Sequence, residues 1–374
     1  MFLITKFLNY LSILKKLGLV QQLSIKDRLK KFYKRDKDLL KLLVVYTLFK
    51  PIFIIIAYLI NPENIYSVIV KWDSLHFLRI ATVGYANSED YAFSYLYPFL
   101  IKVFSYLFYG NYVFSSIFIS NLFGYLTIIV FYKTYGYKAT FLLAFFPTFL
   151  LYSFVPYSDT VTLFFIALTL YLLKGRENNI KAMISYSLSI LSSYTTAITL
   201  PAFFLKKYRR FIVIPLILGE ILFMFFKAST GDFLGLFYIE HEYWGTDFTT
   251  PWGQIKWLLN GWFTSQNWSV FGYVLKPIYW ITRNLAFEAF FLASLYPLFR
   301  RDKFEFSFSL LIIIQLLLII GVPAISIPRL ILKSLPSFYG ISIMLDKKFY
   351  VPYATLGLIL SVLFFIQQSV AFFA

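Results

Sequence analysis

The sequence predicts an all-α fold, a polytopic bundle of membrane-spanning helices with two large loops on one face. Three features predict it. The 374 residues are 59% hydrophobic and only 14% charged, with a mean hydropathy of +0.71, whereas soluble globular proteins have about 25% charged residues. Apolar runs recur from residue 39 to the C-terminus, and helices satisfy the backbone polar groups of such runs inside a bilayer. Basic residues cluster ahead of the first run.

Residues 1–38 form a basic amphipathic segment. Residues 1–41 hold eleven Lys and Arg against three Asp. Basic flanks of membrane helices stay in the cytoplasm and attract anionic lipid head groups. We therefore expect a cytoplasmic N-terminus and contact with membrane lipids. The net charge of +17 is explained in this way without nucleic acid, which we do not expect as a partner.

Residues 39–374 form the predicted transmembrane domain, with about 9–11 spans. The first apolar run, 39–60, ends at Asn61-Pro62. The later runs are 92–109, 111–132, 140–155, 157–173, 182–205, 211–227, 271–299, 304–322, 329–345 and 349–373. The charge pattern places the two large loops, 62–91 and 228–268, together on the outer face.

The middle of the chain has two alternative paths. If the runs 92–109 and 182–205 each cross the membrane once, the loops 133–139 and 174–181 lie outside. If both runs enter the membrane and return to the same side, these loops lie inside, which suits their basic residues. Run length favours the first path. Asp159 lies on the outer face only in the second.

The two outer loops concentrate the rare polar side chains. They hold eight of the 18 acidic residues, namely Glu63, Asp73, Glu89, Asp90, Asp232, Glu240, Glu242 and Asp247. They also hold both histidines and six of the seven tryptophans, namely His76, His241, Trp72, Trp244, Trp252, Trp257, Trp262 and Trp268. Aromatic rings beside carboxylates and imidazoles are typical of sugar recognition, because rings stack on sugar faces and polar groups bind hydroxyls. The alternative is an interfacial tryptophan belt with charges facing water.

Asp73, His76 and Arg79 follow one another at three-residue steps. If residues 74–83 are helical, the three side chains lie along one side of the helix. Asp73 could accept a proton from a sugar hydroxyl, while His76 or Arg79 could stabilise a phosphate leaving group. The alternative makes Asp73 a helix N-cap and Arg79 an interfacial residue whose charge reaches water.

A longer pattern contains these residues. Trp72–Tyr85 has the form Trp-Asp-x-x-His-Phe-x-x-Ile-Ala-x-x-Gly-Tyr, and Tyr91-Ala92-Phe93 and Tyr97-Pro98 follow it. Further segments come in order at Phe146–Asp159, Glu240–Trp252 and Ser326–Pro336. Together they resemble the PIG-V-type mannosyltransferases, which add the second mannose of GPI anchors, and their prokaryotic and archaeal relatives. This family belongs to the GT-C class of polytopic glycosyltransferases. The resemblance covers residues 40–345 and is most specific in the first loop.

The resemblance implies a GT-C-like fold and roles for single residues. Asp73 matches the first-loop acid that serves as catalytic base. Arg329 matches a late Pro-Arg segment and would hold the lipid phosphate. His241 and Trp244 match the second loop and would contact acceptor or donor. Further candidates for the substrate site are Trp72, Asp159 and Glu240.

Metal and redox chemistry are not expected. The chain has no cysteine and only two histidines, which excludes a disulfide framework and a multi-histidine centre. The first loop has no Asp-x-Asp. Glu89 and Asp90 could hold a divalent cation, but adjacent exposed carboxylates usually stay hydrated. We therefore expect no required cofactor.

The sequence thus favours a membrane glycosyltransferase with its site on the extracytoplasmic or luminal face. The resemblance implies a polyprenyl (dolichyl) phosphate hexose as donor, with mannose as the sugar, and a lipid- or protein-linked glycan as acceptor. Asp73 would act as base in one inverting displacement. The alternative is a flippase for polyprenyl-linked sugars or another lipid transporter. A flippase needs polar residues across the membrane depth, whereas here the rare acids gather in two outer loops.

Overall fold

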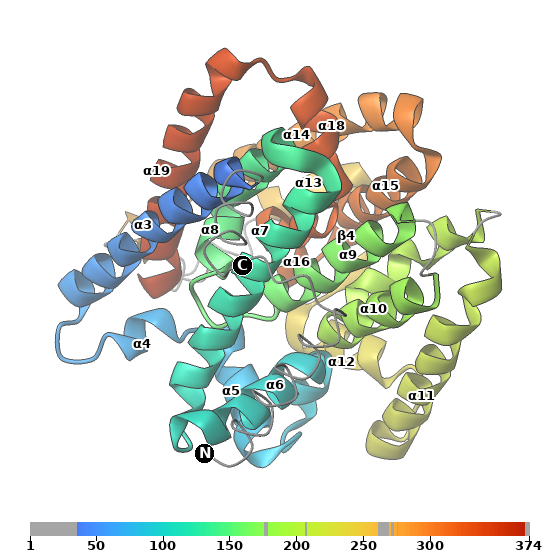
Figure 1. Cartoon of the computed structure of the whole chain (residues 1–374). Helices are drawn as coiled ribbons and strands as arrows, with labels where there is room; N and C mark the ends of the chain where they lie inside the picture. Colours follow the sequence, from blue (N-terminus) through green and yellow to red (C-terminus); the bar gives the residue numbers. More distant parts are fainter. Residues whose placement is uncertain are drawn as a thin grey trace, which may run out of the picture. The chain divides into compact units, whose positions relative to one another are not determined.

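The computed structural model describes residues 36–175, 179–205, 208–260, 269–270, 273–274 and 276–370 (Figure 1). By its contacts the chain divides into two compact units, residues 1–44 and 45–374. The predicted basic segment, 1–38, lies outside the described residues except for 36–38. The candidate site residues all belong to the second unit.

The described chain is helical almost throughout. Its first half contains α3 (Lys37–Ile60), α4 (Tyr66–Ile69), α5 (Asp73–Val83), η1 (Ser88–Ala92), α6 (Leu96–Ser105), η2 (Tyr106–Phe108), α7 (Tyr112–Ala144), α8 (Pro147–Tyr152), α9 (Asp159–Lys174), α10 (Asn179–Ser192) and η3 (Tyr194–Phe204). Its second half contains η4 (Arg209–Phe211), α11 (Val213–Thr230), α12 (Gly235–Trp244), α13 (Pro251–Leu259), α14 (Pro277–Arg301), α15 (Lys303–Leu317), α16 (Val322–Ile325), α17 (Ile327–Leu330), η6 (Ile331–Lys333), α18 (Pro336–Met344), η7 (Lys347–Phe349) and α19 (Tyr350–Val370).

Strands are few and short. β1 (Asp247–Phe248) pairs antiparallel with β4 (Ile319–Ile320), with Asp247 opposite Ile320. β2 (Ser269–Val270) pairs antiparallel with β3 (Tyr273–Val274). The predicted all-α class is therefore confirmed, and β1–β4 matters mainly because it attaches the second outer loop to the end of α15.

Four helices in the described part of the chain are long and apolar enough to cross a membrane. They are Lys37–Ile60, Tyr112–Ala144, Arg209–Thr230 and Lys347–Ser369. The third includes η4 and the fourth includes η7. Because a transmembrane helix needs about 20 mostly apolar residues, these four suggest association with a membrane, as the composition predicts.

The predicted run 140–155 follows a sharp break in α7. Gly136 has φ 77° and ψ −175°, a conformation that residues with a side chain rarely adopt. α7 is therefore kinked at Gly136, and residues 137–144 continue as a helix in a different direction. α8 follows, and Tyr157 then donates a hydrogen bond to the carbonyl of Lys71 at 3.4 Å, so the chain has returned to the first outer loop.

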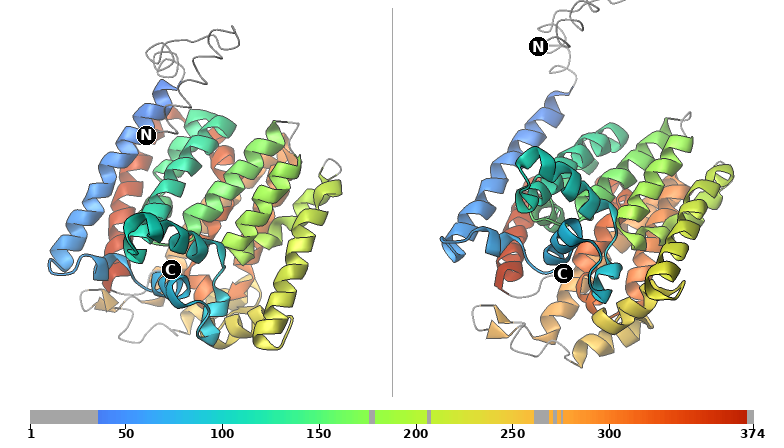
Figure 2. Two further views of the ribbon diagram at one scale, coloured as in Figure 1. Left: turned by 60° about the horizontal axis from the view of Figure 1, so that its bottom comes forward. Right: turned by 90° about the horizontal axis from the view of Figure 1, so that it is seen from below.

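Small polar side chains join the central helices α7, α9 and α10, which run side by side (Figures 1 and 2). Thr160 of α9 donates to the carbonyl of Ser120 in α7 at 3.0 Å. Thr162 donates to Ser192 of α10 at 2.9 Å. Such residues let helices approach closely where apolar burial alone gives no preference for protein over lipid.

The predicted run 92–109 forms a short helical segment, Leu96–Phe108. At about 1.5 Å per residue it spans roughly 20 Å, well below the 30 Å of a bilayer core. It folds against the start of α7, where Tyr97 bonds Ser120 at 2.8 Å and Ser115 donates to the carbonyl of Ile101 at 3.0 Å. The short length of this segment suits the second alternative path for the run 92–109, and the path of the run 182–205 stays a prediction.

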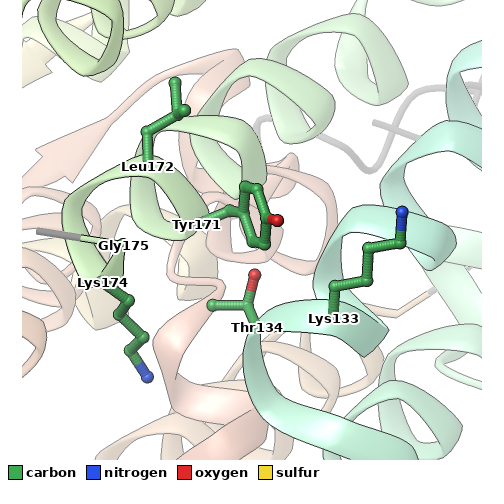
Figure 3. Close-up of a pocket in the computed structure, with 6 residues that line it drawn as sticks. All are labelled: Lys133, Thr134, Tyr171, Leu172, Lys174 and Gly175. Carbon is green, nitrogen blue, oxygen red and sulfur yellow. The ribbon is translucent and has the colours of Figure 1, made fainter. Parts of the chain in front are cut away.

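The second unit has two distinct ends. α4, α5 and α12 lie together at one end, the lower end in the left view of Figure 2. At the opposite end Lys174 of α9 forms an ion pair with Glu305 of α15 at 2.8 Å. A pocket of about 410 Å³ opens at this opposite end (Figure 3) and is lined by Lys133, Thr134, Tyr171, Leu172, Lys174 and Gly175. No candidate site residue contributes to it.

Candidate active site

Trp72 fixes the start of α5 and with it the position of Asp73. Trp72 has φ 55° and ψ −122°, which is unfavourable for a residue with a side chain. Its indole N–H donates to the carbonyl of Gln368 in α19 at 3.0 Å. Strained backbone of this kind costs about 1–3 kcal/mol and is found most often at functional sites. The strain immediately precedes the predicted base.

Asp73 forms an ion pair with Arg329 of α17. The Oδ2–Nη1 distance is 2.5 Å, and the two side chains are 15% and 14% exposed. The guanidinium also lies over the rings of Tyr157 and Tyr152, at 5.2 and 5.7 Å. Its Nε is buried and has no hydrogen-bond partner among the described residues. Arg329 is therefore held in place but keeps one N–H available.

The segment that carries Arg329 is fixed from two sides. On α14, Asn284 donates to the carbonyl of Ala324 at 2.6 Å, and Arg283 donates to the carbonyl of Ile325. From the other side, Thr148 donates to the carbonyl of Pro328 at 2.7 Å. Because Pro328 directly precedes Arg329, these bonds orient the guanidinium before any ligand arrives.

Lys333 is a site residue that the sequence analysis missed. It lies four residues after Arg329, in η6, and is only 4% exposed. Its ammonium donates to the hydroxyls of Ser193 and Thr195, at 2.7 and 2.5 Å. A lysine four residues from a candidate arginine within an apolar run was the available signal, because residues at that spacing share a helix face.

Two further candidate acids lie close to this pair of cations. Asp159, at the start of α9, is 7% exposed and interacts electrostatically with Arg329, Lys333 and Asp73. Glu240 of α12 accepts a hydrogen bond from the Thr246 hydroxyl at 3.1 Å. Burial raises the pKa of Glu240 to about 7, and the negative charge of Asp73 acts in the same direction. Glu240 therefore changes its charge near neutral pH.

His76 and Arg79 form a second cluster with Glu89 and Asp90. One Arg79 nitrogen, Nη2, lies 2.9 Å from His76 Nδ1, 2.9 Å from Glu89 Oε1 and 2.5 Å from Asp90 Oδ1. Asp90 is fully buried and also accepts from the backbone N–H of Asn87 at 3.1 Å. Its hydrogen bond raises the pKa of Arg79 above the usual value.

Two contacts of Nδ1 bear on the tautomer of His76. Nδ1 lies 2.9 Å from Nη2 of Arg79, which can only donate, and 3.3 Å from Oδ1 of Asp90, to which only a protonated Nδ1 could donate. The shorter contact favours an accepting Nδ1, with the ring proton of the neutral imidazole on Nε2. Arg79, in turn, is neutralised by two carboxylates. The sequence analysis assigned two arginines, Arg79 and Arg329, to a phosphate. In the structure Arg329 lies beside Asp73. Arg79 instead forms ion pairs with Glu89 and Asp90 of its own loop.

The same cluster has the spacing of a metal site. One ligand atom each from His76, Glu89 and Asp90 lies within 4.8 Å of the other two, and these residue types suit a divalent ion. However, Arg79 donates a hydrogen bond to all three. A divalent ion would have to displace this guanidinium, so the residues fit a metal poorly while Arg79 stays in place.

α12 covers both clusters with residues one turn apart. Glu240 faces the Asp73–Arg329 pair, and Trp244 lies 6.0 Å from the His76 ring and 5.5 Å from the Phe93 ring. His76 itself stacks on Phe93 at 4.5 Å. His241 is exposed on α12, and the structure does not bring it to either cluster. Trp262 and Trp268 lie outside the described residues.

Most of the predicted site residues thus lie at the end of the second unit that contains α5 and α12, although they come from segments far apart in the sequence. A search against protein families, curated proteins and solved structures finds no match for the chain.

Proposed function

We propose that this protein is a membrane glycosyltransferase that moves a hexose from a polyprenyl (dolichyl) phosphate donor to a glycan acceptor on a lipid or protein. The observation that carries the proposal is the Asp73–Arg329 pair. It places a carboxylate and a guanidinium at 2.5 Å, both largely shielded from water. A base and an anion-binding cation are the two groups that transfer from a sugar phosphate requires. Mannose is the sugar that the sequence resemblance implies.

The proposed reaction is a single inverting displacement. The acceptor hydroxyl attacks the anomeric carbon while its proton passes to Asp73. The bond between that carbon and the phosphate oxygen breaks, and the lipid phosphate leaves as an anion that Arg329 stabilises. The sugar passes through an oxocarbenium-like state, as in inverting glycosidases. No general acid is needed, because the leaving phosphate is already a stable anion.

Without substrate, Oδ2 of Asp73 accepts a hydrogen bond from Arg329. An oxygen occupied in this way is not available to an acceptor hydroxyl. A donor phosphate offers Arg329 another anion. We propose that Arg329 turns to the phosphate when the donor binds and so frees Asp73 for the acceptor hydroxyl.

The second cluster suits the acceptor. The stacked rings of His76 and Phe93, with Trp244 beside them, offer apolar faces of the kind that stack on sugars. The Nε2–H of His76 can donate to a sugar hydroxyl. Arg79, Glu89 and Asp90 hold the imidazole in that state.

The distribution of charge supports an extracytoplasmic or luminal site. Lys133, Lys138, Lys181, Arg300 and Arg301 are exposed, and Lys133 and Lys174 line the pocket at the end opposite Asp73. Basic residues beside membrane helices favour the cytoplasm. This supports our proposal that the Asp73–Arg329 pair faces the other side, where glycans are extended.

The test is sugar transfer by purified protein in lipid vesicles, with dolichyl-phosphate mannose as donor and a panel of lipid-linked glycans as acceptors. We expect Asp73→Asn to lower the rate by about 10²–10⁴-fold, the usual effect of losing a positioned base. The matched control is Glu63→Gln, an exposed acid of the same loop, which should transfer at the wild-type rate. Thermal unfolding of each variant shows that it is folded.

Equal transfer by wild type and Asp73→Asn would show that another group is the base. No transfer by wild type with several polyprenyl-phosphate sugars, together with movement of labelled lipid-linked sugar across the vesicle membrane, would overturn the proposal in favour of a flippase.

A further inference from the structure

We propose that Lys333, together with Arg329, forms a phosphate-binding subsite. Its identification with the lipid phosphate of the donor rests on the proposed function. The shared chemistry of its ligand is a phosphate ester or free phosphate. Lys333 would hold one phosphate oxygen as a point charge, and Arg329 would hold others through its planar guanidinium.

The burial of Lys333 is offset only in part by the protein, through the more distant charges of Asp159 and Glu240. Lysines are almost never fully buried unless they are paired with an opposite charge. Lys333 is 4% exposed, and within the described part of the chain no carboxylate oxygen forms an ion pair with its ammonium. Its described hydrogen-bond acceptors are two neutral hydroxyls, those of Ser193 and Thr195.

Another buried lysine, Lys50, shows an ammonium whose hydrogen bonds and charge are accommodated by the protein itself. Lys50 is 7% exposed and bonds the amide oxygen of Asn121 at 2.6 Å and the carbonyl of Ser153 at 3.2 Å. The rings of Tyr46 and Tyr125 enclose it at 4.6 and 4.5 Å. Lys333 has no comparable enclosure by rings among the described residues.

Lys333 and Arg329 both keep N–H donors for a ligand. An ammonium has three N–H groups, and the hydroxyls of Ser193 and Thr195 accept from two of them. Nε of Arg329 is a further donor, since it is buried without a partner in the described chain. Lys333 and Arg329 lie four residues apart on the continuous helical segment formed by α17 and η6. The charge of Arg329 acts on Lys333, so the two cations are near enough to share one anion.

A neutral Glu240 lessens the electrostatic cost of an entering anion. Asp73 is paired with Arg329, and Asp159 interacts electrostatically with both cations. Glu240 is the third acid near them, and burial raises its pKa to about 7. Protonation of Glu240 removes one negative charge and with it part of the repulsion that an entering phosphate would meet.

The inference is tested by ligand binding to the full-length protein in detergent, with tryptophan fluorescence or calorimetry as the readout. The probes are farnesyl phosphate, inorganic phosphate and farnesol. We expect wild type to bind farnesyl phosphate, and Lys333→Met to weaken its Kd by about 10- to 100-fold, the loss of one charge-assisted hydrogen bond. Farnesol should bind equally to both proteins, because it has no charge. Lys256→Met, an exposed lysine on α13, is the control and should bind like wild type.

Weaker binding of inorganic phosphate by Lys333→Met identifies the ligand as phosphate itself, and an effect on farnesyl phosphate alone identifies the lipid ester. Thermal unfolding separates binding from structure. Methionine is of similar length and needs no hydrogen bonds, so Lys333→Met should unfold at or above the wild-type temperature if the lysine serves a ligand. A clear fall in unfolding temperature with unchanged Kd would overturn the inference.

The inference and the proposed function can fail separately. Phosphate binding that depends on Lys333, without sugar transfer by wild type, would keep the subsite and reject the transferase. Sugar transfer with equal Kd values for wild type and Lys333→Met would keep the transferase and reject the subsite.

Discussion

Arg79 and Arg329 lie at the same end of the second unit but have different hydrogen-bond partners. Their different partners suit them to different functions. Arg79 donates to three acceptors and is neutralised within its own loop. Arg329 has one carboxylate partner, in Asp73, and a buried Nε without one in the described chain. A guanidinium held by one carboxylate can exchange partners at lower cost than one held by two carboxylates. Arg329 is therefore the residue suited to bind and release an anion.

Glu240 should make stability depend on pH. Its pKa is about 7 in the folded protein and about 4.3 in an unfolded chain, so the folded state binds more protons between these values. Its contribution to stability is therefore complete below about pH 4.3 and is lost as the pH rises through 7. The charged groups that face it are Asp73, Arg329 and Lys333. We expect Glu240→Gln to remove this loss of stability with rising pH, because glutamine does not ionise.

The measurement is the unfolding temperature of wild type, Glu240→Gln and Glu242→Gln at half-unit steps from pH 5 to pH 8.5. Glu242 is exposed on the same helix, so its variant should follow wild type. The difference between wild type and Glu240→Gln should grow as the pH rises. Parallel curves for all three proteins would contradict the assignment.

At the scale of elements, α12 is held in place by a contact between two glycines. A Cβ added to Gly321 would lie 2.4 Å from the carbonyl oxygen of Gly245, directly after α12. Gly321 also has φ 87°, which favours glycine. The pairing of β1 with β4 joins the chain that follows α12 to the same segment, just before Gly321. The position of Glu240 and Trp244 therefore depends on a residue in a different part of the chain.

Gly321→Ala should displace α12 from the site. Overlap with a backbone carbonyl and an unfavourable φ together should lower stability by about 1–3 kcal/mol, and we expect at least a tenfold fall in transfer rate. Gly219→Ala is the matched control, because a Cβ there has open space around it and alanine favours the helix. The measurements are transfer rate and unfolding temperature. If both variants behave alike, the contact does not position α12.

The sequence predicted the helical class and several site residues because hydropathy and residue rarity are local signals. Asp73 and Glu240 were singled out as rare acids of the two outer loops, and Arg329 and Asp159 by the segments that resemble a known family. Lys333 was missed, because its importance comes from burial and from Arg329 one turn away. The ion pair between Arg79 and Asp90 was also missed. Glu89 and Asp90 were both expected to be hydrated, whereas Asp90 is fully buried. Tertiary contacts decide such cases.

At the scale of the whole molecule, the sorting of charge between the two ends predicts the orientation in the membrane. The natural chain has no cysteine, so single cysteines can report it without background. A membrane-impermeant maleimide should label Glu242→Cys in intact cells, because α12 would face outward. It should label Lys181→Cys, at the start of α10, only after the membrane is opened. The reverse pattern would place the Asp73–Arg329 pair in the cytoplasm.

The Asp73–Arg329 pair also has a consequence for biosynthesis. Its partners are 256 residues apart, and the bond from Trp72 to Gln368 joins residues 296 apart. Contacts of such separation form late, because the intervening chain must be ordered first. During synthesis the first outer loop is complete long before either partner emerges from the ribosome. The Asp73–Arg329 pair therefore cannot form until α17 has been synthesised, and a chain that ends before α19 lacks the carbonyl that holds Trp72.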